Sequence, residues 1–531
     1  MNNKTIETEV LIVGGGPVGL AMAHELSYQG IDCLLLEQSD GVVSDPKVST
    51  VGPRSMEFCR RWGIAQAIRD AGWPKDHPLD VAWVTRVGGH EIFRIPFPSY
   101  GLRSQPEHTP EPEQVCPQNW FAPIFLDSLG QYPQGMVKLL SRLDSFEQNE
   151  AGVTARVTNL ESETEVVKAQ YLVACDGASS RIRKACKIPA PTFHETQKFQ
   201  SVVFKAPELA KQLGEDNAMV FFLANPTIQE PLRAVDGHSL YRLILKPQAN
   251  GEVRDAKEAI QAAIAIDTPI EIISNLPWHL THRVAEHYNH GRIFFVGDSA
   301  HTLSPSGGFG MNTGIADAVD LGWKLAATLE GWASPQLLDT YEAERKPIAV
   351  RNLEAANANL KRTQKRSIPP AIVSDSPEGE QIRQQMAEGM KRSNVKQEFD
   401  APGIHFGFRY ESPAIVADGT PPSDDPQQWQ QNSYPGSRAP HAWLESGKST
   451  LDLFGHGLVL LNFKDREVTN LEKTCKQKDV PLRTYRIENK AIADLYERNY
   501  VLVRPDGHVA WRGDELPSDS EAIVDRIRGY F

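Results

Sequence analysis

The chain has 531 residues, of which 40% are hydrophobic and 23% charged, and its formal net charge at pH 7 is −12. This length predicts two or three domains, and an acidic chain without a long run of Lys or Arg argues against nucleic acid as a partner. We expect no membrane partner either, because no stretch of about 18 consecutive apolar residues could span a bilayer.

Cysteine usage favours a cytoplasmic protein. The six cysteines are scattered, and no two of them have the C-x-x-C spacing of a redox pair. This pattern fits a reducing compartment and argues against a dithiol flavin reductase. The N-terminus leads from a short polar stretch into an apolar strand, which differs from a signal peptide. Four histidines lie close together at 279, 282, 287 and 290, but their context does not predict convergent imidazoles, so we expect no metal.

The first predicted elements form a dinucleotide-binding unit. The apolar run Glu9–Val13 predicts a buried strand, and Leu20–Leu26 has the apolar spacing of a helix. Between them lie Gly14, Gly16 and Gly19, in the pattern G-x-G-x-x-G. These glycines allow a tight turn, close approach of the backbone to a pyrophosphate, and packing of the helix on the strand. The helix N-terminus then offers free N–H groups to the phosphates.

A second strand selects the class of dinucleotide. Cys33–Leu36 is apolar and is followed directly by Glu37. An acid close to 20 residues beyond the glycines can accept hydrogen bonds from an adenosine ribose. Because it also repels a 2′-phosphate, this site is expected to hold FAD or NAD rather than NADP.

Two further strands end in acidic residues. Tyr171–Cys175 runs into Asp176, and Gly291–Val296 runs into Gly297 and Asp298. Ligands of open α/β sheets lie beyond the carboxyl ends of the strands, so both acids are expected beside the cofactor.

A glycine-rich loop, residues 304–312, follows the last of these strands and leads into a helix predicted from about Thr313 to Leu329. Glycine backbone can approach a flat ring closely, and a helix start favours negative charge at the N1–O2 edge of a flavin. These features favour FAD.

Residues 291–347 resemble the second FAD-binding motif of the group A flavoprotein monooxygenases, the family of para-hydroxybenzoate hydroxylase and phenol hydroxylase. The stretch from Asp176 to Arg183 is similar to that family's motif near the pyrophosphate. Lys47 stands where the family usually has arginine, which replaces a forked contact by a point charge. With the motifs above, the resemblance implies these cofactor-binding residues: Gly14, Gly16, Pro17, Val18, Gly19, Glu37, Gln38, Lys47, Arg54, Gln118, Asp176, Gly297, Asp298, Pro305, Gly308, Gly310, Met311 and Asn312.

The predicted fold is α/β, a Rossmann-like FAD-binding domain with an inserted substrate-binding domain and a C-terminal domain. The FAD-binding domain is expected to be discontinuous, over 1–85, 117–190 and 285–360. The insertions 86–116 and 191–284 contain alternating strand-like runs that predict a mostly antiparallel sheet. Residues 361–405 are expected to form a helical linker. The order of elements in 406–531 is similar to the thioredoxin-like tail of the phenol hydroxylase and polyketide hydroxylase branch, here without redox cysteines.

The resemblance implies a single-component NAD(P)H-consuming aromatic monooxygenase. No second G-x-G-x-x-G follows a strand, so NADH or NADPH is expected as a transient reductant. The implied cycle is hydride transfer to FAD, reaction with O₂ to a flavin C4a-hydroperoxide, and hydroxylation of a phenolic or polycyclic aromatic substrate. Catalytic candidates are Tyr241 and Arg242, of which strand alternation turns only one inward, and Pro305, which by similarity lines the reactive face. A homodimer is expected, with the tail contributing.

Three other functions are compatible with these motifs. The same scaffold could carry out Baeyer–Villiger oxidation or epoxidation. It could be a flavin reductase or oxidase that transfers no oxygen, or a non-catalytic FAD-binding protein with a protein partner. The sequence does not decide the substrate, the regiochemistry or the choice between NADH and NADPH.

Overall fold

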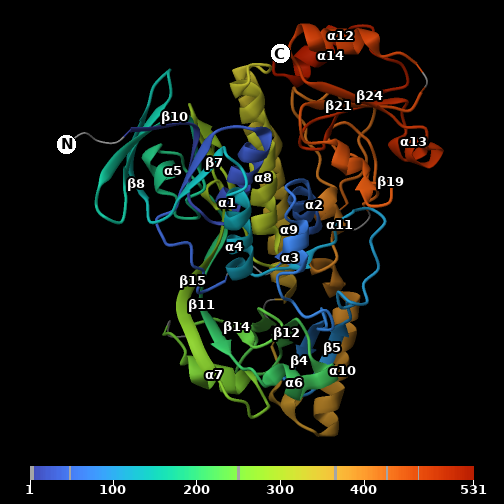
Figure 1. Ribbon diagram of the computed structural model, residues 1–531. Coiled ribbons are helices and arrows are strands. Elements are labelled where there is room, and N and C mark those ends of the chain that lie inside the picture. The colour runs from blue at the N-terminus through green and yellow to red at the C-terminus, as the bar shows by residue number, and fades with distance from the viewer. Residues whose placement is uncertain (1–4, 47–49, 248–251, 364–366, 426–428, 465) are drawn as a thin grey trace.

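The chain folds into two eight-stranded sheets and a smaller C-terminal sheet, arranged around two long helices, α8 (Phe309–Leu329) and α9 (Thr340–Thr363) (Figure 1). The structure is a computed structural model, and it describes residues 5–46, 50–247, 252–363, 367–425, 429–464 and 466–531. Lys47 therefore lies outside the described residues.

The first sheet has a parallel centre, with strand order β16-β17-β10-β1-β2-β7, and β8 and β9 extend it by antiparallel pairing. Its central residues, such as Val10, Leu11 and Ile12, are fully buried, as expected for parallel strands covered on both faces. The strands of this sheet are β1 (Thr5–Val13), β2 (Cys33–Leu36), β7 (Gly135–Lys138), β8 (Arg142–Gln148), β9 (Val153–Thr158), β10 (Thr164–Ala174), β16 (Asn289–His290) and β17 (Ile293–Phe295).

The second sheet has the order β18-β15-β11-β14-β13-β12-β4-β5, and all its pairs are antiparallel except β12 with β4. In Figure 1 it lies below the first sheet. This confirms the predicted mostly antiparallel sheet. Its strands are β4 (Val81–Val84), β5 (Glu91–Ile95), β11 (Thr192–Lys205), β12 (Val220–Leu223), β13 (Pro231–Ala234), β14 (Leu240–Leu245), β15 (Glu271–Val284) and β18 (His301–Thr302).

Helices cover both sheets and fill the space between domains. Helices α1, α4 and α8 contribute to one apolar core with the first sheet. None of the described helices combines the length and apolar character needed to cross a bilayer. Besides α8 and α9, the helices are α1 (Pro17–Gln29), α2 (Pro53–Arg61), α3 (Ala65–Arg69), α4 (Gln118–Leu129), α5 (Arg181–Ala185), α6 (Leu209–Leu213), α7 (Ala256–Ala263), α10 (Pro377–Arg392), α11 (Pro402–Phe406), α12 (Thr469–Gln477), α13 (Lys490–Tyr496) and α14 (Ser520–Ile527).

The C-terminal domain has a four-stranded sheet, β22-β21-β23-β24, in which only the β21–β22 pair is parallel. These strands are β21 (Leu458–Asn462), β22 (Leu482–Arg486), β23 (Tyr500–Val503) and β24 (Val509–Gly513), and a turn containing Asp506 and Gly507 joins the last two. Two small sheets pair β3 (Thr50–Val51) with β6 (Gln114–Val115) and β19 (Trp443–Glu445) with β20 (Lys448–Ser449).

Two domain boundaries differ from the sequence prediction. Strand β4 lies within the predicted 1–85 segment but pairs with β12 and β5 in the second sheet. The boundary prediction failed here because four consecutive apolar, buried residues are equally compatible with a strand of either sheet. The predicted linker 361–405 is not a free arm. Its residues Ile372, Met390 and Val395 share an apolar core with Trp83 of β4, so this segment covers the second sheet.

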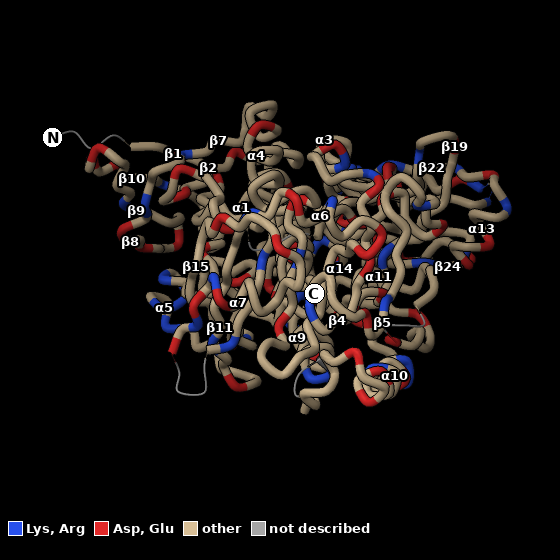
Figure 2. The backbone as a smooth tube through the Cα atoms, turned by 90° about the horizontal axis from the view of Figure 1, so that it is seen from below, with Lys and Arg blue, Asp and Glu red and all other residues tan. Residues whose placement is uncertain are grey.

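The surface carries interspersed charges of both signs. Figure 2, which shows the molecule from below, has Lys and Arg interspersed with Asp and Glu along the chain, for example in α10. Such mixing gives no extended single-sign field to attract a polyelectrolyte.

The junction of α8, α9 and the C-terminal domain contains a buried ion network. Lys324 Nζ lies 2.7 Å from Asp320 and 2.8 Å from Glu344, and Arg504 of the C-terminal domain lies 2.7 Å from Glu344 and 3.1 Å from Asp320. Arg504 also pairs with Asp506. The side chains of Lys324 and Arg504 are fully buried, so each charge depends on its partners for stabilisation.

We expect Arg504→Met to destabilise the fold strongly. The substitution leaves Asp320 and Glu344 with Lys324 as their remaining cation and removes the ion-pair partner of Asp506, and breaking such a network costs about 3–5 kcal/mol. Denaturant unfolding should show a lower free energy of unfolding. A matched control is Arg466→Met, which removes an exposed pair with Glu515 and should change stability by at most about 0.5 kcal/mol. Equal stabilities of the two variants would contradict a stabilising role for the network.

Candidate functional site

Four strand ends of the first sheet meet in register at one edge. Val13 at the end of β1 is aligned with Leu36 of β2 and Ala174 of β10, and Ala174 is aligned with Phe295 of β17. Backbone hydrogen bonds continue past the strands, from Gly14 N to the Leu36 carbonyl at 2.8 Å. The predicted motif residues after each strand are thus brought together at this edge, although they lie far apart in the sequence.

The glycine turn after β1 has the shape of a phosphate cradle. Gly14 has φ +110°, and a Cβ there would lie 2.4 Å from the Cys175 carbonyl oxygen. A Cβ on Gly16 would meet nothing within 4 Å, although Gly16 has ordinary extended backbone. No side chain caps the N-terminus of α1 at Gly16, so its first N–H groups face this open space. Gly14 is therefore required by packing, whereas Gly16 leaves room for a ligand.

The two acids beside this cradle differ in how the protein holds them. The Glu37 carboxylate accepts hydrogen bonds from Gly15 N at 2.7 Å and from Ser39 N and Oγ at 2.8 Å. These bonds orient the carboxylate and leave lone pairs for a ribose. Asp176 accepts one bond from Ile182 N at 3.2 Å, while its buried Oδ1 has no partner among the described residues. An unpaired carboxylate oxygen fits a donor on a bound ligand.

The second half of the cradle is the 304–312 loop. Helix α8 begins four residues earlier than predicted, because Gly308 (φ +69°) forms its N-terminal cap in the left-handed region and no side chain caps the helix. A Cβ on Gly310 would also meet open space. Asn312 Oδ1 accepts hydrogen bonds from Gly52 N at 2.8 Å and Ser55 Oγ at 2.7 Å. An uncapped helix start that borders open space fits the N1–O2 edge of a flavin.

Asp317 of α8 supports the segment that carries Asp298. Its carboxylate accepts bonds from Gly297 N at 3.2 Å, His301 at 2.7 Å and Arg345 at 2.7 Å. Burial opposes ionisation, but Arg345 and His301 outweigh it and hold the pKa of Asp317 below its usual value. This fixed anion anchors Gly297 from beneath and leaves Asp298 exposed on the open side.

A cavity of about 730 Å³ lies between the 304–312 loop and the second sheet. This volume is within the range of small-molecule sites. Its lining is rich in aromatic side chains: Phe97, Tyr100, Phe199, Phe222, Trp278, Phe309, Phe399 and Phe406. Pro305, Gly308 and Asn312 line the same cavity, so it opens directly onto the flavin side of the cradle.

Two arginines face this cavity from neighbouring strands. Arg233 of β13 is directly opposite Arg242 of β14 in the strand register. Arg242 donates to Ser201 Oγ at 2.9 Å and to the Pro46 carbonyl at 3.0 Å, and neither arginine makes an ion pair with a described carboxylate. Burial and the charge of Arg242 lower the pKa of Arg233 to about 10. Like charges directly opposite one another repel, and an anion between them would reduce this repulsion. The pair can therefore bind an anion.

Glu398 is a buried acid in the cavity wall. It lies after α10, in the segment that the sequence analysis assigned to a linker. Burial raises the pKa of Glu398 to about 7, although Arg362 and Arg233 act in the opposite direction. His405 also lines the cavity, and burial lowers its pKa to about 4. Glu398 can therefore change charge near neutral pH, while His405 stays neutral there.

The structure separates the two catalytic candidates on β14. Arg242 faces the cavity, but Tyr241 points to the opposite face, where it is buried in the apolar core and stacks on Phe204. The proposal of Tyr241 as a site residue is therefore wrong, because strand alternation admits only one of the pair.

The contacts of Arg54 also differ from its predicted role as a cofactor-binding residue. Its guanidinium is buried and donates to Glu57 at 2.8 Å and to the Asp506 carbonyl at 2.7 Å, so it faces the C-terminal domain. Other predicted cofactor residues stay predictions: Pro17 and Val18 begin α1, Gln38 is exposed after β2, Gln118 begins α4, and Met311 lies in the first turn of α8.

Arg233, Glu398 and the 396–406 segment line the cavity but are not among the residues predicted from the sequence. Arg233 lies on a four-residue strand that was not recognised, although its alternation with Leu232 and Ala234, both buried, was a usable signal. For Glu398 no local signal exists. Among the described residues, no group of three or more His, Cys, Asp or Glu has the geometry of a metal site, and His279 and His282 point to opposite faces of β15.

Comparisons with known proteins agree with this geometry. Residues 7–356 match the family of FAD binding domains, and residues 432–531 match the family described as aromatic-ring hydroxylase, C-terminal. The chain is 30% identical to aklavinone 12-hydroxylase RdmE from Streptomyces purpurascens over 98% of both chains. Among solved structures, RebC with bound 7-carboxy-K252c is 52% identical, with a TM-score of 0.96 over 99% of this chain and 100% of that one. Aklavinone-11 hydroxylase in complex with FAD and aklavinone is 28% identical, with a TM-score of 0.82 over 99% and 100%.

We expect Gly16→Val to abolish FAD binding without unfolding the protein. The backbone at Gly16 is extended, so valine fits it, but the new side chain would occupy the open space over the start of α1. The flavin absorbance per purified chain should fall at least about tenfold, with little change in the far-UV spectrum. Gly389→Ala is a matched control, because its Cβ also meets open space but lies on α10, away from the cradle. Full FAD occupancy in the Gly16 variant would contradict this assignment.

Proposed function

This chain belongs to the group A flavoprotein aromatic monooxygenases, and within that family we propose that its substrate is a flat, multi-ring aromatic acid. The protein is an FAD-dependent enzyme that uses NAD(P)H and O₂ to hydroxylate aromatic compounds. The proposal concerns which aromatic compounds fit the cavity, a question that the family alone leaves open.

The opposed pair Arg233 and Arg242 carries this proposal. Both arginines are partly exposed toward the cavity and neither forms an ion pair with a described carboxylate, so an anion placed between them would be attracted by two positive charges. Guanidinium groups bind carboxylates through paired hydrogen bonds. The aromatic walls contributed by Phe222 and Trp278 favour a flat ring system on the same ligand.

The relatives support a substrate of this kind. RebC was solved with 7-carboxy-K252c after soaking with chromopyrrolic acid, and both names denote compounds with an acid group. Aklavinone-11 hydroxylase was solved with aklavinone. We therefore propose a carboxylated polycyclic compound as substrate here, with chromopyrrolic acid as the first probe.

Bound FAD would supply the redox and oxygen-transfer chemistry of the reaction, and the glycine turn with Glu37 and Asp176 would hold it. The chain's own groups orient the substrate. Arg242 is held by Ser201 and by the Pro46 carbonyl, so its guanidinium presents a fixed fork to a carboxylate. The aromatic walls exclude water, and the Pro305–Asn312 loop forms the wall nearest the flavin side.

A stopped-flow experiment tests the proposed function. We expect chromopyrrolic acid to accelerate anaerobic reduction of the bound flavin by NADH or NADPH, and ¹⁸O₂ to place one labelled hydroxyl oxygen in the product. A ring-expanded ester or an epoxide would instead indicate Baeyer–Villiger oxidation or epoxidation. Formation of H₂O₂ alone with every polycyclic acid would favour the reductase or oxidase function. Flavin that stays oxidised with both nucleotides would favour the non-catalytic alternative.

The homodimer and the cytoplasmic location expected from the sequence are further proposals. The C-terminal domain is the part of the chain that we expect at the subunit interface. Sedimentation equilibrium of the FAD-loaded protein would distinguish a dimer from a monomer.

Removing the cation at position 233 should weaken binding of acids selectively. For Arg233→Met we expect the Kd of chromopyrrolic acid to rise about 10- to 100-fold, the range of one or two charge-assisted hydrogen bonds. Titration by flavin difference absorbance measures this Kd. Arg94→Met is a matched control, since Arg94 lies on the same sheet but pairs with Asp80 outside the cavity lining. An unchanged Kd in the Arg233 variant would rule out its role in binding the acid.

Binding of an acid should also weaken as the pH rises through about 7. Burial raises the pKa of Glu398 to about 7, so the group is neutral below this pH and becomes an anion above it. The new negative charge offsets Arg233 and repels a carboxylate, so the Kd should increase roughly tenfold between pH 6 and pH 8. In the Glu398→Gln variant the Kd should not change over this pH range. Other charged groups that line the cavity are Arg103, Glu113, Glu230, Lys246, Lys396 and Asp400. A slope that persists in this variant would assign the titration to another group.

A further inference from the structure

Residues 106–113, which we call the wall segment, form part of the wall of the substrate cavity. Pro106, His108, Thr109 and Glu113 of this segment line the cavity. The short strands β3 and β6 pair just beyond its C-terminal end. The position of the wall segment therefore affects the shape of the cavity.

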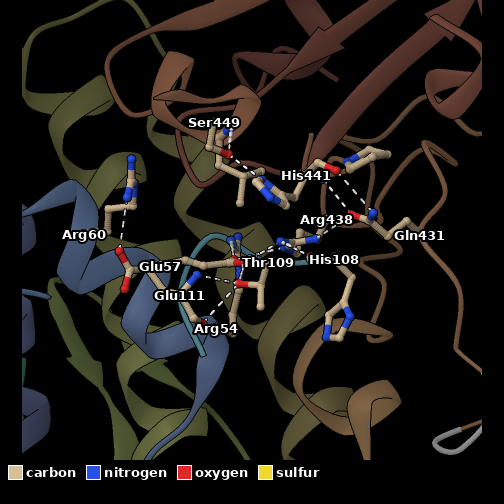
Figure 3. A network of polar contacts seen from close by, with 12 residues as sticks. Arg54, Glu57, Arg60, His108, Thr109, Glu111, Gln431, Arg438, His441 and Ser449 are labelled. Atoms are coloured by element: carbon tan, nitrogen blue, oxygen red, sulfur yellow. Dashed lines mark hydrogen bonds and ion pairs between the residues drawn. The ribbon is translucent and has the colours of Figure 1, made fainter. Parts of the chain in front are cut away.

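Glu57 of α2 fixes the wall segment through a buried hub (Figure 3). Thr109 Oγ1 donates to Glu57 Oε1 at 2.7 Å, and Arg54 donates to Glu57 Oε2 at 2.8 Å. The side chain of Glu57 is only 3% exposed. A carboxylate buried to this degree needs cationic partners, which makes the hub sensitive to each arginine.

The second arginine of the hub comes from the C-terminal domain. Arg438 donates to both oxygens of Glu57, with Nε at 3.0 Å from Oε2. Its Nη2 also donates to the His108 carbonyl at 3.1 Å. The same guanidinium lies 4.7 Å from the ring centroid of Phe406, another cavity residue. One side chain, 1% exposed, thus contacts the hub, the wall segment and a further wall residue.

A second connection runs parallel to the first. Glu111 of the wall segment pairs with Arg60 of α2 at 3.2 Å, and Arg60 pairs with Asp452 of the C-terminal domain at 2.7 Å. The helix that carries Glu57 and Arg60 also holds Asn312 on the flavin side, through Ser55. Helix α2 therefore lies between the C-terminal domain, the wall segment and the flavin loop.

We propose that Arg438 is a positioning residue through which the C-terminal domain holds the wall segment against the substrate. The inference rests on the proposed function in one respect: a displaced wall weakens substrate binding and admits water, so reducing equivalents end as H₂O₂ rather than in product. It also assigns a role to the C-terminal domain that does not depend on redox cysteines.

The Arg438→Met variant tests this role without a buried charge left unpaired. Glu57 keeps Arg54 as a cation, so the fold should persist, whereas the wall segment loses the bond to the His108 carbonyl. Arg512→Met is the matched control. Arg512 is a partly buried arginine of the same domain, with a side chain 9% exposed, and it pairs with Asp418 and Glu497 away from the wall segment.

Hydrogen exchange measures the position of the wall segment, and substrate binding with H₂O₂ release measures its effect on the reaction, so either result can be negative without the other. Hydrogen exchange of the FAD-loaded protein should speed up about tenfold in peptides covering 106–113 in the Arg438 variant, and not in the Arg512 variant. The Kd of chromopyrrolic acid should rise about tenfold, the share of NAD(P)H recovered as H₂O₂ should at least double, and kcat should change less than KM. Arg438→Lys, which keeps the charge, should restore part of each effect.

Thr109→Val gives an independent check on the pathway. It removes the hydroxyl that Glu57 accepts but keeps the side chain's shape. It should shift the Kd in the same direction, and the double variant with Arg438→Met should show less than the sum of the two effects. Unchanged exchange in 106–113, or equal effects in the Arg512 control, overturns the proposal. A wild-type protein that does not respond to chromopyrrolic acid overturns the proposed substrate class instead, and the exchange result still decides the role of Arg438.

Discussion

Helix α8 is buried at every residue from Thr313 to Ala327, so each charge on it must be satisfied inside the protein. The helix carries Asp317, Asp320 and Lys324, all with no exposed surface. Water cannot stabilise these groups, and their partners must therefore come from other elements. Arg345 of α9 pairs with Asp317, and Glu344 of α9 with Lys324, while Arg504 arrives from the C-terminal domain. This requirement joins three parts of the chain along a single helix.

The same helix begins at the flavin loop, so the ion network and the cofactor cradle are mechanically connected. Asp317 holds Gly297 and His301 on one side and Arg345 on the other. Arg345 and the hydrogen bond from His301 keep the pKa of Asp317 below its usual value, so its carboxylate is an anion beneath the cradle. The C-terminal domain contacts the site at two levels, through Arg504 at the middle of α8 and through Arg438 at the cavity wall. Both contacts hold residues of other parts of the chain in place.

The cofactor half of the site was accessible from the sequence because its signals are local. Gly14, Glu37, Asp176 and Gly297 each follow an apolar strand, and parallel pairing brings the strand ends to one edge. The substrate half was not accessible in the same way. The alternation on β14 predicted that one of Tyr241 and Arg242 faces inward but not which one, and β4 fits either sheet by its composition. Glu398 lies in a polar stretch whose packing against the second sheet depends on contacts distant in sequence.

This difference follows from what each half must recognise. A pyrophosphate and a ribose are met by backbone N–H groups and one acid, which a short motif can encode. The substrate cavity is lined by residues from Pro46, 50–53, 96–115, 199–246, 278–280, 305–312 and 396–406. Its two arginines lie directly opposite one another on neighbouring strands, where like charges repel. An acid bound between the two arginines would relieve this repulsion, which is the physical basis of the proposed preference for an acidic substrate.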